Sequence, residues 1–174
     1  MKVNEIFQSI QGESLYAGFP TVFVRFSGCN LRCSYCDTTY AYEEGTEMEP
    51  QEILDEIKKY YYKRVCITGG EPLLQKELEK LLYLLEDYNV TIETNGSMDI
   101  GLIKLSPKHS YVMDVKCPSS GFSNEMNLNN FEYLSERDEI KFVIGGKDDY
   151  EWAKGIIKDY YKKGTITFSP VFGS

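Results

Sequence analysis

The sequence predicts an α/β protein whose sheet is a partial, open barrel of about six βα units. Two observations point to this fold class. Short runs rich in β-branched and aromatic residues alternate with longer amphipathic runs, as parallel strands alternate with helices. Polar residues and glycines follow nearly every expected strand, which is typical of barrel strands that end at a common mouth. Six or so units are too few for a closed eight-stranded barrel, and a doubly wound open sheet is the alternative.

Six stretches have the length and composition of strands. They are 21–26, 65–68, 90–93, 111–115, 140–144 and 165–169, and a further short strand is expected near 102–105. Helical periodicity marks 50–63, 75–88 and 148–162. Pro50 suits the first turn of the first helix, whose apolar stripe is expected to include Tyr60 and Tyr61.

Composition narrows the classes of protein. The 174 residues suit one domain, residues 1–174, and 42% hydrophobic with 26% charged residues indicates a globular chain. Lys+Arg 19 against Asp+Glu 27 gives a net charge of −8, which disfavours binding to nucleic acid or anionic membranes. The sequence shows neither an apolar run of about 20 residues nor the apolar stretch of a signal peptide, so we expect a cytoplasmic location.

Three of the five cysteines lie on one expected loop, with the spacing C-x3-C-x2-C: Cys29, Cys33 and Cys36. The odd total argues against a disulfide framework. Three thiolates this close can bind three irons of a [4Fe–4S] cluster, which leaves the fourth iron open for a substrate or cofactor.

Two plainer uses of the loop are a structural zinc site and an electron-transfer cluster. Structural zinc needs a fourth ligand, and only Cys66, Cys117 and the single histidine, His109, remain. Cys66 lies within an expected strand, where a buried thiol is the commoner role. Neither Cys117 nor His109 has the spacing of a zinc knuckle, so the cluster with an open iron is favoured.

The cysteine loop, with the aromatic Tyr35 before its last cysteine, resembles the signature of the radical S-adenosylmethionine (SAM) superfamily. A second superfamily feature is TGGEP, residues 68–72, where glycines after a strand let the backbone approach a ligand closely. The resemblance implies a [4Fe–4S] cluster and S-adenosylmethionine, which together supply a 5′-deoxyadenosyl radical. It also implies an external one-electron donor, of flavodoxin or ferredoxin type.

Further segments resemble the 7-carboxy-7-deazaguanine synthase family, over nearly the whole chain. They are EIFQSIQGES (5–14), VRFSGC (24–29), CDT (36–38), VCITGGEPLLQ (65–75), IETNG (92–96), KCPSSG (116–121) and KFVI (141–144). That family converts 6-carboxy-5,6,7,8-tetrahydropterin to 7-carboxy-7-deazaguanine with loss of ammonia, on the route to queuosine and related deazapurines. The resemblance further implies Mg²⁺ and a homodimer.

The site residues follow from these matched segments. For S-adenosylmethionine we expect Tyr35, Asp37, Gly70, Glu93, Asp114, Val115 and Lys116. For the pterin we expect Ile10, Gln11, Gly12, Glu13, Arg25, Thr68 and Asn95, and for Mg²⁺ the hydroxyl of Thr38. Glu93 and Asn95 are chosen from their place at a strand end that faces the mouth. A rival to residues 114–116 is Ser106-Pro107-Lys108, which also matches the family's cofactor-binding pattern.

A physical argument also supports the assignment of Arg25 to the substrate site. Strand alternation puts Thr21, Phe23 and Arg25 on one face of the strand. An anionic pterin approaching a protein of charge −8 needs local cations, and arginine binds a carboxylate through two parallel hydrogen bonds.

The resemblance leaves two questions open. Relatives usually continue past residues 169–173 into a further helix and strand, so the sequence is expected to be a minimal or a truncated member. The alternative enzyme is a small glycyl-radical-enzyme activase, and a non-catalytic iron–sulfur protein is a further alternative. The activase does not account for EIFQSIQGES, Arg25 and Cys-Asp-Thr together.

Overall fold

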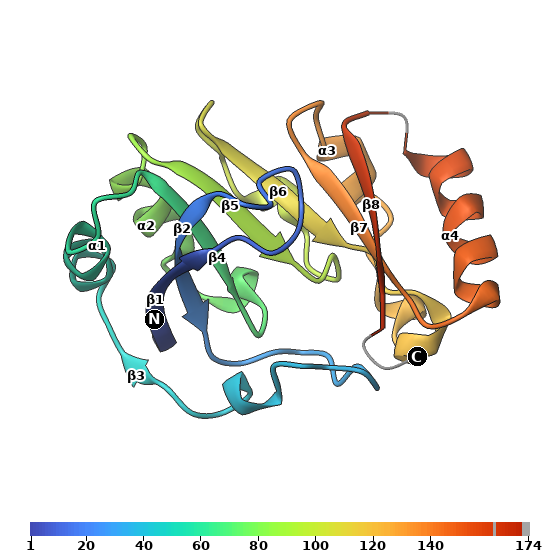
Figure 1. Ribbon diagram of the computed structural model, residues 1–174, viewed down its shortest axis with the longest axis horizontal. Helices are drawn as coiled ribbons and strands as arrows, with labels where there is room; N and C mark the ends of the chain where they lie inside the picture. Colours follow the sequence, from blue (N-terminus) through green and yellow to red (C-terminus); the bar gives the residue numbers. More distant parts are fainter. Residues whose placement is uncertain (162, 172–174) are drawn as a thin grey trace.

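The computed structural model describes residues 1–161 and 163–171, and it contains one sheet of eight strands (Figure 1). The strand order is β3-β1-β2-β4-β5-β6-β7-β8. Six strands are parallel: β2 (Pro20–Phe26), β4 (Arg64–Gly69), β5 (Asn89–Thr94), β6 (His109–Asp114), β7 (Glu139–Ile144) and β8 (Thr165–Pro170). At one edge, β1 (Lys2–Ile10) and β3 (Thr46–Glu47) add two antiparallel strands.

The strand order confirms the partial barrel. From β2 to β8 the strands follow one another in chain order, and right-handed crossovers then place the connecting segments on one side of the sheet. A doubly wound sheet reverses its order to put helices on both faces. In Figure 1, α1 (Pro50–Lys58) and α2 (Leu78–Leu84) lie toward the left-hand end of the curved sheet and α4 (Lys147–Tyr160) toward the right-hand end.

The three predicted helices occur, but they are shorter: α1 (Pro50–Lys58), α2 (Leu78–Leu84) and α4 (Lys147–Tyr160). A further short helix, α3 (Asn130–Tyr133), was not predicted. Five 3-10 turns complete the elements: η1 (Thr39–Ala41), η2 (Pro72–Leu74), η3 (Ile100–Leu102), η4 (Pro118–Ser120) and η5 (Ser123–Glu125). Residue 162, the expected end of the last helix, and residues 172–174 lie outside the described residues.

Two expectations about local structure were wrong, and the strand β1 was not predicted. The stretch near 102–105 is not a strand, because the Asp99 carboxylate accepts from Gly101 N and caps the turn η3. Helix α1 ends before Tyr61, whose side chain is fully exposed instead of packed. β1 was missed, since Val3 is its only buried residue and its apolar alternation is weak.

The two faces of β2 separate the core from the site. Val22, Val24 and Phe26 are fully buried in the core with the apolar residues of α1 and α2. Phe23 and Arg25 alternate with them and line a cavity on the other face. Each buried Leu, Ile or Phe contributes about 1.5–3 kcal/mol, so the first face anchors the strand and fixes the direction of the second.

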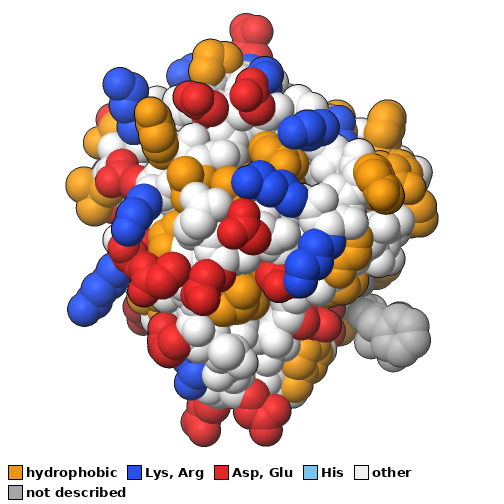
Figure 2. Space-filling view, turned by 90° about the vertical axis from the view of Figure 1, so that its left-hand side faces the viewer, with side chains coloured by type: hydrophobic (Ala, Val, Ile, Leu, Met, Phe, Trp, Pro, Cys, Tyr) orange, Lys and Arg blue, Asp and Glu red, His pale blue; other side chains and the backbone are white. Residues whose placement is uncertain are grey.

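Outside the core, charges of both signs occupy the surface. On the face in Figure 2, acidic and basic side chains are interspersed with apolar ones. No helix in the described part of the chain is long and apolar enough to span a membrane.

The carboxyl end of β4 lies against the carboxyl end of β2. A Cβ on Gly69 would lie 2.2 Å from the carbonyl oxygen of Phe26, and one on Gly70 would lie 1.9 Å from that of Gly28. Gly69 also has φ of +133°, a conformation that L side chains rarely adopt. Glycine is therefore required here, and Gly70 N and Glu71 N donate across the contact to Phe26 O and Gly28 O.

Gly69→Ala should lower the free energy of unfolding by more than about 2 kcal/mol, because the methyl group meets backbone and the positive φ adds strain. Urea unfolding of the apoprotein measures this. Gly155→Ala is the matched control, since Gly155 lies in α4 with open space around its Cβ position. It should raise the free energy of unfolding by about 0.5–1 kcal/mol. Equal effects of the two substitutions would refute the close-contact argument.

Candidate functional site

A cavity of about 420 Å³ lies between the sheet and the cysteine loop. The carboxyl ends of parallel strands form its wall, as expected for the mouth of a barrel. The structure brings most of the predicted site residues together here. Those that line the cavity are Gln11, Glu13, Arg25, Cys29, Cys33, Tyr35, Cys36, Asp37, Thr38, Thr68, Gly70, Glu93, Asn95, Asp114 and Lys116.

Three predicted residues do not line the cavity. Ile10 ends β1 with an exposed side chain, and Val115 is fully buried in the core. Gly12 lies beside the cavity, and its N–H donates to the side chain of Gln11. A direct role for the side chains of Ile10 and Val115 is therefore not supported by their positions.

The cysteine loop, residues 28–38, is held at several points. Gly28 N donates to Ala41 O and Ser34 N donates to Ser120 O. Within the loop, Cys36 N donates to Cys33 O at 3.2 Å. All three thiols are partly exposed and outside any disulfide, and burial raises the pKa of Cys33. Three reduced thiols on one braced loop fit the three protein ligands of a [4Fe–4S] cluster.

The other candidate metal ligands lie elsewhere. His109 is at the start of β6, where its Nε2 contacts Leu85 O at 3.2 Å. Cys66 is buried in β4, and Cys117 is buried just before η4, where burial raises its pKa to about 12. None of the three lines the cavity. The fourth ligand of a structural zinc site is therefore not supplied by the candidates named from the sequence.

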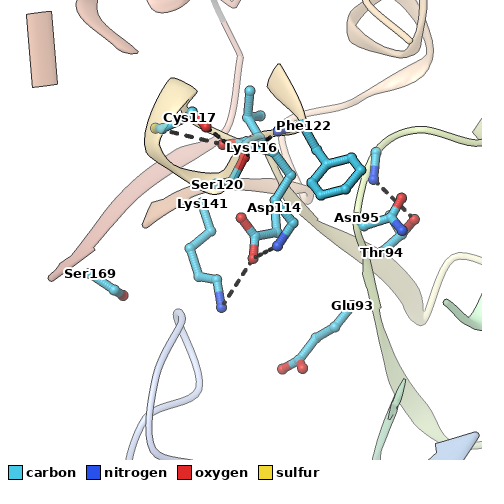
Figure 3. Close-up of polar contacts among 12 residues, drawn as sticks. Glu93, Thr94, Asn95, Asp114, Lys116, Cys117, Ser120, Phe122, Lys141 and Ser169 are labelled. Atoms are coloured by element: carbon cyan, nitrogen blue, oxygen red, sulfur yellow. Dashed lines mark hydrogen bonds and ion pairs between the residues drawn. The ribbon is translucent and has the colours of Figure 1, made fainter. Parts of the chain in front are cut away.

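Two lysines and two carboxylates form an ion-pair chain across one wall. Figure 3 shows the part of it formed by Asp114, Lys116 and Lys141. Asp114 Oδ2 lies 2.8 Å from Lys116 Nζ and 3.8 Å from Lys141 Nζ, and Lys141 Nζ lies 2.8 Å from Glu13 Oε1. Both lysine side chains are only 13% exposed. Burial lowers their pKa, but Asp114, together with Glu13 at Lys141, outweighs it, so both pKa values are raised. Both lysines therefore stay protonated at neutral pH.

Lys141 is a functional candidate that sequence reasoning missed. It lies in β7, within the segment KFVI, where a lysine between buried residues signals a polar face. The cavity also receives Ser169 from β8, whose hydroxyl contacts Glu13 Oε2 at 3.4 Å. Alternation along β7 could have suggested Lys141, but its pairing with Glu13 spans 128 residues and is set by the fold.

A hydrogen-bond chain crosses the centre of the cavity. Glu93 accepts from Thr68 Oγ1 at 2.8 Å and from Gln11 Nε2 at 3.3 Å. Gln11 comes from the loop after β1, Thr68 from β4 and Glu93 from β5. An amide, a hydroxyl and a carboxylate together provide the donors and acceptors that a nitrogen-rich ring requires.

Asn95 connects this wall to the cysteine loop. Its Nδ2 donates to Asn30 Oδ1 at 3.0 Å and lies 3.8 Å from Cys29 Sγ. Arg25, on β2, lines the same cavity, and its Nε donates to Glu5 Oε1 at 2.8 Å. The cavity thus combines the cysteine loop with a cation and an ordered polar chain.

The two rival cofactor segments occupy opposite ends of β6. Residues 106–108 precede the strand, and Lys108 Nζ is paired with Asp87 at 3.1 Å. Asp114 ends the strand, and Lys116 follows it into the cavity. The geometry therefore favours residues 114–116.

Cys33→Ala should abolish cluster assembly, because only the thiolates of Cys29 and Cys36 then remain and a third iron loses its protein ligand. The measurement is iron and sulfide content after anaerobic reconstitution. Cys117→Ala is the matched control and should keep the full iron content, since its thiol is buried away from the cavity. Normal iron in Cys33→Ala would exclude it as a ligand.

Comparison with known proteins agrees with this geometry. A family model described as the Radical SAM superfamily matches residues 23–173. A 7-carboxy-7-deazaguanine synthase of Methanospirillum hungatei is 45% identical over 100% of this chain and 74% of its own, and that of Clostridium acetobutylicum is 45% identical over 99% and 82%. The crystal structure of QueE from Escherichia coli has a TM-score of 0.82 at 26% identity, covering 98% of this chain and 84% of its own. The chain therefore belongs to the radical SAM superfamily and, within it, to the 7-carboxy-7-deazaguanine synthase family.

Proposed function

We propose that the chain catalyses the radical SAM ring contraction of 6-carboxy-5,6,7,8-tetrahydropterin to 7-carboxy-7-deazaguanine, with release of ammonia, in deazapurine and queuosine biosynthesis. One observation carries this proposal. A single cavity combines the three-cysteine loop with Arg25 and with the chain Gln11–Glu93–Thr68. A cluster-binding loop is common to the superfamily, but the cation and the ordered polar chain beside it fit a carboxylated pterin.

The residues present fit the cofactors. When bound, the [4Fe–4S] cluster and S-adenosylmethionine supply a 5′-deoxyadenosyl radical. Cys29, Cys33 and Cys36 would hold the cluster, and an external one-electron donor would be required to reduce it. The remaining predicted cofactor contacts line the same cavity, and two of them, Tyr35 and Asp37, belong to the cysteine loop itself. These contacts are Tyr35, Asp37, Gly70, Glu93, Asp114 and Lys116.

The chain's own residues orient the substrate. Arg25 binds the pterin carboxylate and overcomes, locally, the repulsion of a protein of charge −8. Gln11, Glu93 and Thr68 are already hydrogen-bonded to one another, so they present a preorganised edge to the ring. Glu13, held by Lys141, and Asn95 complete the predicted substrate contacts.

We place Mg²⁺ at Thr38. Its hydroxyl donates to Asp37 Oδ1 at 2.7 Å, and both residues line the cavity. Mg²⁺ prefers oxygen ligands and keeps several waters, so a hydroxyl contact completed by substrate oxygens suits it.

The other assignments stay predictions. We treat residues 1–174 as one radical SAM domain, which is supported by the single sheet that contains every described strand. A homodimer is supported by the family resemblance and by β8 at an edge of the sheet with Ile166 and Phe168 exposed, and light scattering tests it. The flavodoxin- or ferredoxin-like donor and the cytoplasmic location rest on the chemistry of reduced thiols and an iron–sulfur cluster.

The decisive experiment is anaerobic. Protein reconstituted with iron and sulfide is reduced and mixed with S-adenosylmethionine, Mg²⁺ and 6-carboxytetrahydropterin, and the products are followed by mass spectrometry. We expect 7-carboxy-7-deazaguanine. Formation of 5′-deoxyadenosine without it would overturn the substrate assignment and favour the activase alternative. Absence of both products with a full cluster would overturn the radical function.

Arg25→Ala should raise KM for the pterin roughly tenfold or more, because a charge-assisted carboxylate contact is lost. S-adenosylmethionine cleavage in the absence of pterin should continue at close to the wild-type rate. Steady-state kinetics and 5′-deoxyadenosine release measure the two effects. An unchanged KM would remove Arg25 from the substrate site.

A further inference from the structure

Arg25 is held by side chains to which the proposed function assigns no role. Glu5 on β1 lies directly opposite Arg25 in the β1–β2 register, and its Oε1 accepts from Arg25 Nε at 2.8 Å. The Arg25 Cζ lies 5.9 Å from the ring centre of Phe7 and 5.7 Å from that of Tyr40. The Tyr40 hydroxyl also donates to Glu5 Oε1, at 3.2 Å. Glu5, Phe7 and Tyr40 therefore surround the guanidinium, and we call them the Arg25 bracket.

Within the Arg25 bracket, only the Glu5 carboxylate forms a hydrogen bond to the guanidinium, at Nε. No acceptor in the described part of the chain bonds the two terminal amino groups. Arg25 lines the cavity, so these amino groups remain available to a ligand there. Two parallel N–H donors on a rigid plane match the two oxygens of a carboxylate.

We propose that Glu5, assisted by Tyr40, is a positioning residue that makes Arg25 selective for the substrate carboxylate. The inference rests on the proposed function, in which Arg25 binds that carboxylate. Glu5 acts only through Arg25: its hydrogen bond fixes the rotation of the guanidinium. Tyr40 lies in η1, two residues after Thr38, so the bracket also joins the substrate strand to the cysteine loop.

Two effects of Glu5 oppose each other. Its negative charge weakens the attraction of Arg25 for an anion, while its hydrogen bond orients the two terminal amino groups that bind the anion. The Glu5 side chain is 40% exposed, so water and salt screen its charge. Orientation is not screened, because a free guanidinium loses rotational freedom whenever it binds a carboxylate in two-point contact. Orientation is therefore expected to dominate.

Alanine and glutamine at position 5 separate these effects. Glu5→Ala removes the acceptor and the charge, whereas Glu5→Gln keeps an acceptor oxygen and removes only the charge. Binding of 6-carboxypterin and of unsubstituted pterin is measured by anaerobic calorimetry on the reconstituted protein with S-adenosylmethionine. The readout is the ratio of the two dissociation constants, which a general loss of stability would not change selectively.

Wild-type protein should bind 6-carboxypterin at least tenfold more tightly than pterin. Glu5→Ala should reduce this preference by about tenfold, and Glu5→Gln should keep most of it. Tyr40→Phe removes only an exposed hydroxyl and should reduce the preference by a smaller factor. Gln8→Ala, an exposed change on the same strand, is the matched control and should leave the ratio unchanged. In an Arg25→Lys background, Glu5→Ala should have no further effect.

Each contrary result has a distinct meaning. A wild-type preference retained in Glu5→Ala, or lost equally in Glu5→Gln, would overturn the positioning role while leaving the proposed function intact. An undiminished effect of Glu5→Ala in the Arg25→Lys background would do the same. Wild-type protein that binds both pterins equally would overturn the role of Arg25. Protein that binds neither would overturn the proposed substrate and the inference together.

Discussion

The site depends on the contact between the carboxyl ends of β2 and β4. Gly69 and Gly70 allow the two backbones to approach where any side chain would collide. The next residue, Glu71, fixes the contact. The carboxylate of Glu71 is fully buried and accepts from Leu73 N, Thr94 Oγ1 and Asn95 N. Burial raises its pKa, and these three donors oppose that rise. One residue thereby joins the end of β4 to the end of β5 and to η2.

This contact sets the position of the chemistry. The cysteine loop begins at Gly28, whose carbonyl accepts a hydrogen bond from Glu71 N. The strands β4 and β5 carry the neighbouring predicted contacts to cofactor and substrate. Main-chain hydrogen bonds therefore fix the positions of the thiols and of Glu93 relative to each other, and the main chain is less mobile than the side chains. The ion-pair chain of Lys116, Asp114 and Lys141 continues this wall along the neighbouring strands β6 and β7.

Most of the parallel sheet could be predicted from the sequence, because buried parallel strands are nearly continuous apolar runs such as VCIT. The cysteine loop was equally predictable, since its ligands are local in sequence. β1 was not, because its faces are mixed and its partner, β2, was needed to define it. Lys141 and the pairing of Arg25 with Glu5 were missed for a related reason: each depends on register or on contacts between distant segments.

The loop between β1 and β2 has a consequence for how the molecule assembles. Leu15 N donates to Glu139 at the start of β7, and Glu13 contacts Lys141 and Ser169, which are 128 and 156 residues away. This loop is therefore synthesised well before the distant residues with which it forms these contacts. Closing such long loops is entropically costly and slow, so these contacts form late. The cysteine loop and β4 are closer in sequence, so we expect the part of the cavity around the cysteine loop, Arg25 and Thr68 to become ordered before the part that contains Glu13.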